Sequence, residues 1–174
     1  MDMNDFVKTL LTRRSVRAFK PDPISREDLE TLMEAAAYAP SGMNRQTWEF
    51  TAVANPEKIQ QLAALIREEL GREQYDMYRP AALIIPSNRK DSPFGREDNA
   101  CALENIFLAA HSMGIGSVWI NQLQGISDRP AIRKFLTELG IPEDHVVYGM
   151  AALGYAAKVS ASDVKKTAVR RIVE

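Results

Sequence analysis

Ala81-Ala82-Leu83-Ile84-Ile85 is a continuous apolar run near the middle of the chain, and Pro86 follows it directly. A short run of this kind is typical of a strand that is buried on both faces of a sheet. We therefore expect the central strand to cover residues 81–85 and to end at Pro86, because proline has no N–H to donate to a neighbouring strand. A polar loop is then expected over residues 87–95.

Further strands and helices can be placed outward from this run. Residues 48–53 alternate between polar and apolar, and residues 115–120 and 146–153 are runs that suit two more strands. Helices are predicted where apolar residues recur at helical spacing, with caps or prolines at the ends. They cover residues 26–39, 56–70, 98–113 and 130–139, after a short helix near residues 5–11 that carries an apolar stripe.

Helices and strands are mixed in this prediction without a strict alternation in the first half of the chain. Such a pattern predicts an α+β fold with one central sheet covered by helices. A length of 174 residues suits one domain and is short for two. We therefore expect a single domain over residues 1–174.

The composition argues against several classes of partner. The formal net charge of −1 and the pI of about 6.2 lack the basic excess of a protein that binds nucleic acid or an acidic membrane surface. No apolar run approaches the roughly 18 residues of a membrane span, and the first residues lack the layout of a signal peptide. A lone cysteine, Cys101, suits a reducing compartment. These features predict a cytoplasmic protein.

The stretch Arg13-Arg14-Ser15-Val16-Arg17-Ala18-Phe19 concentrates three guanidinium groups and a hydroxyl within a few residues. If it is extended, Ser15 and Arg17 point to one side of the chain and Arg14 points to the other. Guanidinium groups form strong, charge-assisted bonds with phosphate oxygens, so the stretch can receive an anion. The alternative is a solvated basic patch that complements the dipole at the end of the first helix.

A second candidate is the turn-rich segment from Pro40 to Trp48. Asn44 and Gln46 each carry amide donors and a carbonyl acceptor, so either can read the edge of a planar heterocycle. Loops between rigid elements are common places for binding groups. The alternative is that Ser41 and Asn44 only satisfy their own turn.

Several common site patterns are missing from the sequence. Gly114-Ile115-Gly116 follows a helix and precedes a strand, the reverse of a Rossmann turn, and no Walker loop occurs. The two histidines, His111 and His145, are far apart and have no zinc-ligand spacing with Cys101. We interpret His111 as a partly buried helix residue and Cys101 as a packing residue.

Four motifs together resemble the FMN-dependent nitroreductase family. They are the arginine stretch at residues 13–19, the segment Pro40-Ser41-Gly42-x-Asn44-x-Gln46-x-Trp48-x-Phe50, the run from Gly114 to Ile120, and Leu153-Gly154-Tyr155 followed by a basic tail. They occur in the family's order and span nearly the whole chain. The resemblance implies a central mixed or antiparallel sheet flanked by helices, in a homodimer whose subunits exchange their termini.

The resemblance also implies a set of residues that bind FMN. Arg13 and Ser15 would meet the phosphate, joined by Lys165 or Lys166 of the tail, and Gly154 would leave room for the phosphate end. Arg17 would lie by the N1/O2 edge of the ring. Backbone N–H groups around Ile120 and Asn121 would face the flavin N5, and the segment from Pro40 to Asn44 would come from the other subunit. The implied cofactor-binding set is Arg13, Arg14, Ser15, Arg17, Pro40, Ser41, Gly42, Asn44, Ile120, Asn121, Gly154, Lys165 and Lys166.

By this resemblance the chain is expected to be an NAD(P)H-dependent nitroreductase or quinone reductase. A hydride from NAD(P)H would pass through flavin N5 to an electron-poor acceptor, a nitroaromatic compound or a quinone, in a ping-pong mechanism. Arg17 would stabilise the negative charge of the reduced flavin, and no catalytic side-chain acid or base is required. The alternatives are dehalogenation, enoate reduction or flavin fragmentation on the same fold, or a protein that only holds flavin.

Three positions depart from the family's pattern. Thr47 stands where proline is frequent, Gly42 where serine is frequent, and Thr167 where an arginine is common. The segment from residue 71 to residue 98 is also short for the family, in which extra helices can cover the flavin. The sequence therefore predicts a comparatively open active site with weak selectivity among acceptors.

Overall fold

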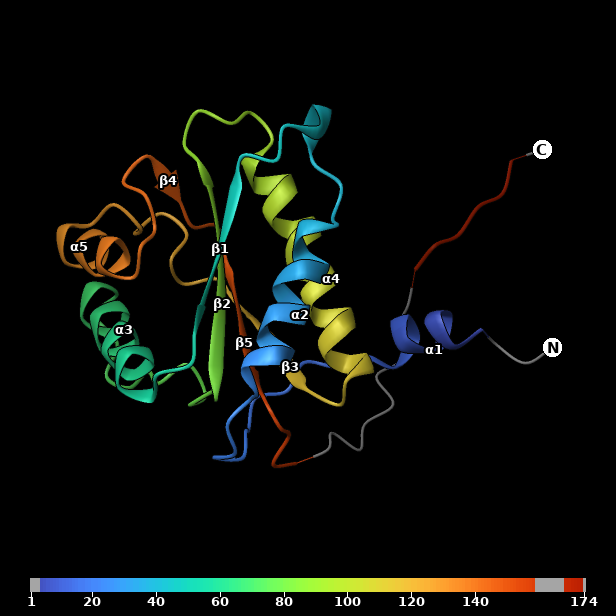
Figure 1. Cartoon of the computed structure of the whole chain (residues 1–174), viewed down its shortest axis with the longest axis horizontal. Helices are drawn as coiled ribbons and strands as arrows, with labels where there is room; N and C mark the ends of the chain where they lie inside the picture. The colour runs from blue at the N-terminus through green and yellow to red at the C-terminus, as the bar shows by residue number, and fades with distance from the viewer. Residues whose placement is uncertain (1–3, 159–167, 174) are drawn as a thin grey trace.

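The computed structural model describes residues 4–158 and 168–173 of the chain. These residues form helices on both sides of one sheet (Figure 1). In chain order the elements are α1 (Asp5–Thr12), α2 (Arg26–Ala37), the 3₁₀ helix η1 (Gly42–Asn44), β1 (Trp48–Val53), α3 (Pro56–Glu69), β2 (Ala82–Arg89), α4 (Gly95–Ser112), β3 (Gly116–Ile120), α5 (Pro130–Glu138), β4 (His145–Val146) and β5 (Met150–Gly154).

The named strands form an antiparallel sheet in the order β1-β2-β5-β3, and β4 pairs with the far end of β2. Thr51 of β1 lies opposite Ile85 of β2, and Leu83 of β2 lies opposite Ala152 of β5. Val118 of β3 pairs with Ala152 from the other side. The α+β fold with a central sheet is therefore confirmed.

Helices cover both faces of the sheet: α2 and α4 lie on one face, and α3 and α5 lie on the other (Figure 1). β2 contributes to both layers because successive side chains of a strand point to opposite faces. Leu83 and Ile85 belong to the core on the α3 and α5 side. Ala82 and Ile84 belong to the core on the α2 and α4 side. The apolar run at residues 81–85 thus forms a strand buried on both faces, as expected.

The expectation that this strand ends at Pro86 was wrong. β2 continues through Pro86 to Arg89, and Ser87 and Asn88 on the way are fully buried. The polar loop expected from residue 87 therefore starts only after Arg89.

The pairing of β2 explains why Pro86 is tolerated. Ile84 lies opposite Ala151 of β5, whereas Asn88 lies opposite Val146 of β4, so the facing segment has one residue more. Pro86 therefore lies at an irregular part of the ladder, where a missing N–H costs little. The same irregularity divides the strand expected over residues 146–153 into β4 and β5.

The helix starts follow the sequence signals in one case and depart from them in another. The Oγ atom of Ser25 accepts a hydrogen bond from the N–H of Asp28 at 3.0 Å, which caps α2 as expected. α4 begins at Gly95, earlier than the expected Asp98. A Cβ atom on residue 95 would lie 3.3 Å from the ring of Tyr148, so glycine serves close packing there. Because glycine is a poor helix former, the sequence pattern does not indicate this start.

α1 and the segment 168–173 lie on the same side of the molecule and extend away from its body (Figure 1). The apolar stripe of α1 is exposed, with Phe6 at 64% and Leu11 at 59% of their full accessible surface. Ile172 and Val173 are 90% and 93% exposed. These apolar side chains have no cover in a single chain. Among the described residues, no helix is both long enough and apolar enough to span a membrane.

Candidate functional site

The arginine stretch, residues 13–19, lies along the free edge of the sheet next to β3. Ser15 forms a parallel bridge with Ser117, and the N–H of Val16 donates to the carbonyl of Ser117 at 2.9 Å. Just beyond β5, the carbonyl of Tyr155 accepts a hydrogen bond from the N–H of Lys20 at 2.8 Å. The stretch is therefore paired at both of its ends with the sheet, as expected for an extended run.

Two glycines allow the arginine stretch to lie close to the sheet. A Cβ atom on Gly116 would lie 2.8 Å from Cγ2 of Val16, and one on Gly154 would lie 2.8 Å from Cδ1 of Phe19. A larger residue at either position would displace the stretch. The space next to Gly154 holds the ring of Phe19, and the expected role of this glycine near a phosphate stays a prediction.

A cavity of about 810 Å³ lies beside the arginine stretch. Arg14, Ser15, Arg17 and Lys158 contribute to its wall, and Ser15 and Arg17 are exposed. The cavity presents three cationic side chains, and no carboxylate belongs to its described lining. A concave surface with charge of one sign attracts ligands of the opposite sign, so this cavity is suited to an anion.

The three arginines of the stretch differ in their contacts. Arg14 Nη1 donates hydrogen bonds to the carbonyls of Leu11 at 3.0 Å and Arg13 at 2.8 Å. Arg13 Nε lies 3.9 Å from Glu104 Oε1, a long and partly exposed ion pair that contributes little stability. Arg17 has no hydrogen bond or ion pair with any described residue, so its guanidinium group is available to a ligand.

His111 is a cavity residue to which the sequence analysis assigned no function. It lies in the last turn of α4, and its Nε2 atom is 2.9 Å from Oγ1 of Thr12. Burial lowers the pKa of the His111 imidazole, and the charges of Arg13 and Arg14 lower it further. The expectation of a partly buried helix residue is confirmed. Its contact with Thr12 joins segments far apart in the sequence, which no local pattern predicts.

The second candidate segment, residues 40–46, folds around η1 beyond the end of α2 (Figure 1). The N–H of Gly42 donates to Oδ1 of Asp98 at 2.8 Å, and Asp98 is only 3% exposed. Met43, Asn44 and Gln46 have left-handed backbone conformations, with φ values of 55°, 54° and 48°. Such conformations are costly for residues other than glycine and are often found at functional sites.

Polar groups of this loop also bind one another. The Nε2 atom of Gln46 donates to Oδ1 of Asn44 at 2.7 Å. The N–H of Gln46 donates to Oγ of Ser41 at 3.2 Å, while Pro40 is exposed. In a single chain, Ser41 and Asn44 therefore do satisfy their own turn, which was the alternative left open by the sequence.

The arginine stretch and the loop at residues 40–46 lie at opposite ends of α4. The loop contacts Asp98 near the start of this helix, and Thr12 contacts His111 near its end. A helix rises about 1.5 Å per residue, so the two contacts are roughly 20 Å apart. A single chain therefore does not bring together the two segments expected to form one site.

The remaining expected site residues are at the end of β3 and in the tail. Ile120 is buried, and Asn121 is exposed. The N–H of Asn121 donates to Oε1 of its neighbour Gln122 at 3.0 Å. The tail residues Lys165 and Lys166, as well as Thr167, lie outside the described residues, so their expected contacts stay predictions.

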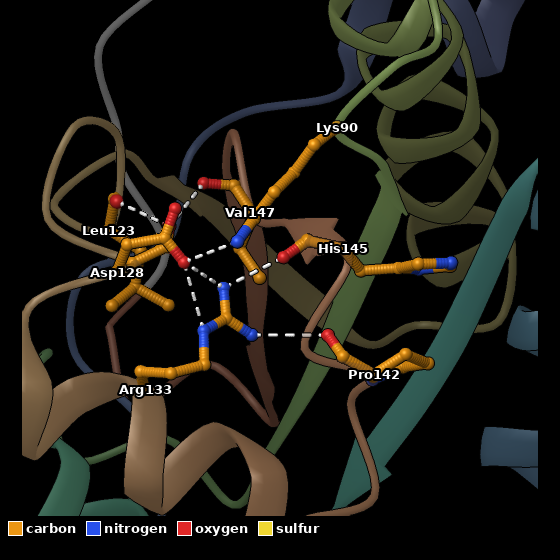
Figure 2. Close-up of polar contacts among 8 residues, drawn as sticks. Lys90, Leu123, Asp128, Arg133, Pro142, His145 and Val147 are labelled. Atoms are coloured by element: carbon orange, nitrogen blue, oxygen red, sulfur yellow. Dashed lines mark hydrogen bonds and ion pairs between the residues drawn. The ribbon is translucent and has the colours of Figure 1, made fainter.

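A separate polar cluster ties α5 to β4 (Figure 2). Arg133 lies 2.9 Å from Asp128 and donates to the carbonyls of Pro142 at 3.2 Å and His145 at 2.7 Å. Lys90 Nζ donates to Oδ1 of Asp128 at 2.8 Å. Partial burial tends to raise the pKa of Asp128, but hydrogen bonds and charge from Lys90 and Arg133 outweigh it and hold this pKa below its usual range. Because the cluster uses these groups internally, we assign it a structural role.

A model of the nitroreductase family matches residues 10–155, a range that includes the arginine stretch and all the named strands. The chain belongs to the nitroreductase family. It is similar to the FMN-bound nitroreductase of Bacteroides fragilis NCTC 9343, with a TM-score of 0.92 and 42% identity over 99% of this chain and 100% of that one.

Two further proteins are also similar to this chain. The FMN-bound nitroreductase of Desulfitobacterium hafniense DCB-2 has a TM-score of 0.88 and 27% identity, over 99% of this chain and 100% of that one. The FMN reductase (NADPH) of Bacillus subtilis strain 168 is 27% identical over 177 residues, which cover 91% of this chain and 68% of the relative.

Two departures of this chain from the family's pattern have a local structural reason. The ring of Phe94 lies so close to Gly42 that a Cβ atom on residue 42 would overlap it, so a serine does not fit there unless Phe94 moves. The hydroxyl of Thr47 donates to Oδ1 of the buried Asn88 at 2.7 Å. A proline at position 47 could not make this bond.

Proposed function

We propose that this chain is an FMN-dependent oxidoreductase that uses NAD(P)H to reduce an electron-poor acceptor, such as a nitroaromatic compound or a quinone. The observation that carries the proposal is the cationic cavity beside the arginine stretch, in a member of the nitroreductase family. Two similar solved structures contain bound FMN, and a curated relative is an FMN reductase that uses NADPH.

The cavity fits the phosphate end of FMN. A phosphate monoester carries about two negative charges near neutral pH and offers several acceptor oxygens. Ser15 supplies a hydroxyl, and Arg14 and Lys158 supply cations in the wall of the cavity. Its volume of about 810 Å³ is in the usual range for small-molecule sites. The proposed phosphate contacts are Arg13 and Ser15, with Arg14 and Gly154 beside them and Lys165 or Lys166 from the tail, although Arg13 is not part of the described cavity wall.

The chain binds and orients the cofactor in this proposal. FMN, when bound, supplies hydride exchange with the nicotinamide and with the acceptor. Arg17 holds a positive charge beside the N1/O2 edge of the ring, where negative charge is stabilised by a fixed cation. Backbone N–H groups near Ile120 and Asn121 would orient the N5 edge, which requires Oε1 of Gln122 to release the N–H of Asn121. Donor and acceptor occupy the same place in turn, which corresponds to ping-pong kinetics.

We further propose that the protein works as a homodimer with exchanged termini. The loop at residues 40–46 is roughly 20 Å from the arginine stretch along α4, so a second copy of the chain has to supply it to the same ring. The exposed apolar side chains of α1 and of residues 168–173 would be covered in such a dimer. The residues that line the ring from the other subunit would be Pro40, Ser41, Gly42 and Asn44.

An open active site stays a prediction that agrees with the order of elements. Between α3 and α4 the described chain holds only β2 and its two connecting loops. Without an extra helix to close over the ring, the enzyme is expected to accept electron-poor compounds of different shapes. Steady-state kinetics with a series of quinones and nitroarenes checks this, and strong selection among acceptors of similar size would contradict it. A cytoplasmic location likewise stays a prediction.

The visible absorption spectrum of the purified protein tests the proposed function. We expect a yellow protein that releases FMN on heating, and whose colour bleaches under anaerobic NADPH or NADH and returns when a quinone is added. A colourless protein that also fails to take up FMN would contradict the proposal. A yellow protein that neither nucleotide bleaches would indicate a flavin-holding protein and contradict the enzymatic part.

A further inference from the structure

His111 is part of the cationic cavity but is not among the residues assigned above to FMN. Its imidazole shares the wall of this cavity with Arg14, Arg17 and Lys158. It comes from the last turn of α4, and Thr12 of α1 holds it in place. A side chain that can gain a proton therefore lies among fixed cations, at the place where a phosphoryl group is proposed to bind.

The hydrogen bonds of Thr12 determine which nitrogen of the neutral imidazole carries the proton. A threonine hydroxyl has a single hydrogen, and Thr12 Oγ1 donates it to the carbonyl of Lys8 at 2.8 Å. The 2.9 Å contact between Thr12 Oγ1 and His111 Nε2 is then donated by the imidazole. Nδ1 consequently carries the lone pair, and no described residue forms a hydrogen bond with it.

The charges around the imidazole oppose its protonation as long as no anion is bound. Burial lowers the pKa of His111, and Arg13 and Arg14 lower it further. Arg17 and Lys158 add positive charge in the cavity wall, and Lys8 adds positive charge on α1. The acidic side chain beside these cations is that of Glu104 of α4, whose Oε1 atom lies 3.9 Å from Nε of Arg13. A bound dianion reverses this balance because it attracts a proton to the ring.

We propose that His111 is an anion-binding residue: when a phosphoryl group enters the cavity, the imidazole takes up a proton from solvent and donates a hydrogen bond from Nδ1 to a phosphoryl oxygen. Thr12 accepts from Nε2 in both states and keeps the ring oriented. The inference rests on the proposed function in that the phosphoryl group is the one of FMN.

The sign of the resulting pH dependence follows from linkage. Between the pKa of His111 in the free protein and its higher pKa in the FMN-bound protein, the bound form holds up to one proton more at this residue, so His111 strengthens binding as the pH falls. The gain begins near the pKa of His111 in the FMN-bound protein. It is complete below the lower pKa of His111 in the free protein.

Proton NMR of the FMN-bound protein tests the assignment directly. The chain contains only two histidines, so the ring signals of His111 and His145 can be assigned with a single variant. We expect His111 to titrate with a pKa above the ordinary value of about 6.5 in the bound protein. A pKa below that value in the bound protein would overturn the proposal, whatever the behaviour of any variant.

FMN affinity gives a second, independent test with His111→Gln. Glutamine keeps an N–H donor for Thr12 but does not titrate. Dissociation constants of wild type and variant are measured from FMN fluorescence after dilution of the bound protein, at about pH 5.5 and about pH 8.5. The phosphate of FMN also titrates near about pH 6, and this contribution cancels in the ratio of variant to wild type at each pH.

We expect this ratio to be about tenfold larger at the lower pH, which corresponds to a rise of one unit in the pKa of His111 on binding. His145→Gln is the matched control, because His145 is buried and bound to Ser87 at 3.0 Å. An equal ratio at both pH values would overturn the role of His111. If wild type binds FMN but the ratio is equal at both pH values, only this inference fails. If wild type binds no FMN at either pH, the proposed function fails as well.

Discussion

The ring of Phe94 occupies the place where a side chain on Gly42 would lie. Phe94 is the residue before α4, and Asp98 in the first part of the same helix accepts the N–H of Gly42. The start of α4 therefore holds the loop at residues 40–46 by packing and by a hydrogen bond. This loop has left-handed residues at Met43 and Asn44, so its shape depends on such external contacts.

Gly42→Ser is expected to lower the free energy of unfolding by about 1–3 kcal/mol, because it forces extra atoms into a packed place. Replacement of Phe94 by Ala in the same chain should relieve the overlap. Urea unfolding of the two single variants and the double variant forms a cycle that measures their coupling. Strictly additive effects would show that Phe94 does not exclude a side chain at position 42.

Asp98→Ala should leave the N–H of Gly42 without its partner and lower the free energy of unfolding by about 1–3 kcal/mol. Asp98→Asn keeps a carbonyl oxygen at the same place and should cost less. Hydrogen exchange of the Gly42 amide is the local measurement, and it should become faster in Asp98→Ala than in Asp98→Asn. Unchanged exchange in both variants would contradict the anchoring role of Asp98.

Arg17→Ala is expected to lower the midpoint potential of the bound flavin and to slow its reduction by NAD(P)H about tenfold or more. The physical reason is the loss of a fixed cation beside the edge of the ring that gains negative charge. Redox titration and stopped-flow absorbance measure the two effects. Arg26→Ala is a suitable control, because Arg26 is exposed on α2 and bonded to Glu30. An unchanged potential in Arg17→Ala would remove Arg17 from its proposed place.

Leu11→Asp is expected to weaken the dimer and, with it, the retention of FMN. Leu11 is 59% exposed in a single chain and would be buried between subunits if the termini are exchanged. Sedimentation velocity measures the oligomeric state, and the absorbance of the same sample measures bound FMN. Leu70→Asp, at the C-cap of α3, is the matched control, since Leu70 is 38% exposed and α3 lies on the opposite side of the molecule from α1 (Figure 1). A dimer of unchanged stability in Leu11→Asp would contradict the proposed exchange.

Asp128 should make a small contribution to the acid sensitivity of the fold. The pKa of Asp128 is lower in the folded protein than in the unfolded chain, where it is near 3.8. The bonds of Asp128 to Lys90 and Arg133 therefore stabilise the fold fully above the unfolded pKa, and this stabilisation is lost as the pH falls through the folded pKa. The side chain is 57% exposed, so screening limits the effect to about 1 kcal/mol or less. Urea unfolding at about pH 7 and about pH 3 should show a smaller loss of stability in Asp128→Asn than in wild type.

The layers of the fold could be predicted because local patterns determine them. Ser25 caps α2 as its spacing to Asp28 indicates, and the run from residue 81 forms a strand buried on both faces. The path of β2 through Pro86 could not be predicted in this way, because it depends on an irregular pairing with a segment about sixty residues later. Long-range strand pairing determines where β2 ends, so the local sequence does not predict this boundary.

The candidate site was predictable only in part for the same reason. The arginine stretch is concentrated in the sequence, and the hydroxyl of Ser15 and the guanidinium groups of Arg14 and Arg17 do line one cavity, whereas Arg13 does not. His111 enters this cavity through a bond to Thr12, at a separation of 99 residues, and Asp98 reaches Gly42 across 56 residues. Neither contact leaves a local pattern that could be recognised without the fold.

The alternation of β2 between two cores has a consequence for how the protein unfolds. Leu83 and Ile85 pack on one side of this strand and Ala82 and Ile84 on the other, so neither core can open without exposing residues of the strand that the other needs. The two layers of helices should therefore unfold together in one cooperative transition, and neither half of the domain is expected to fold before the other.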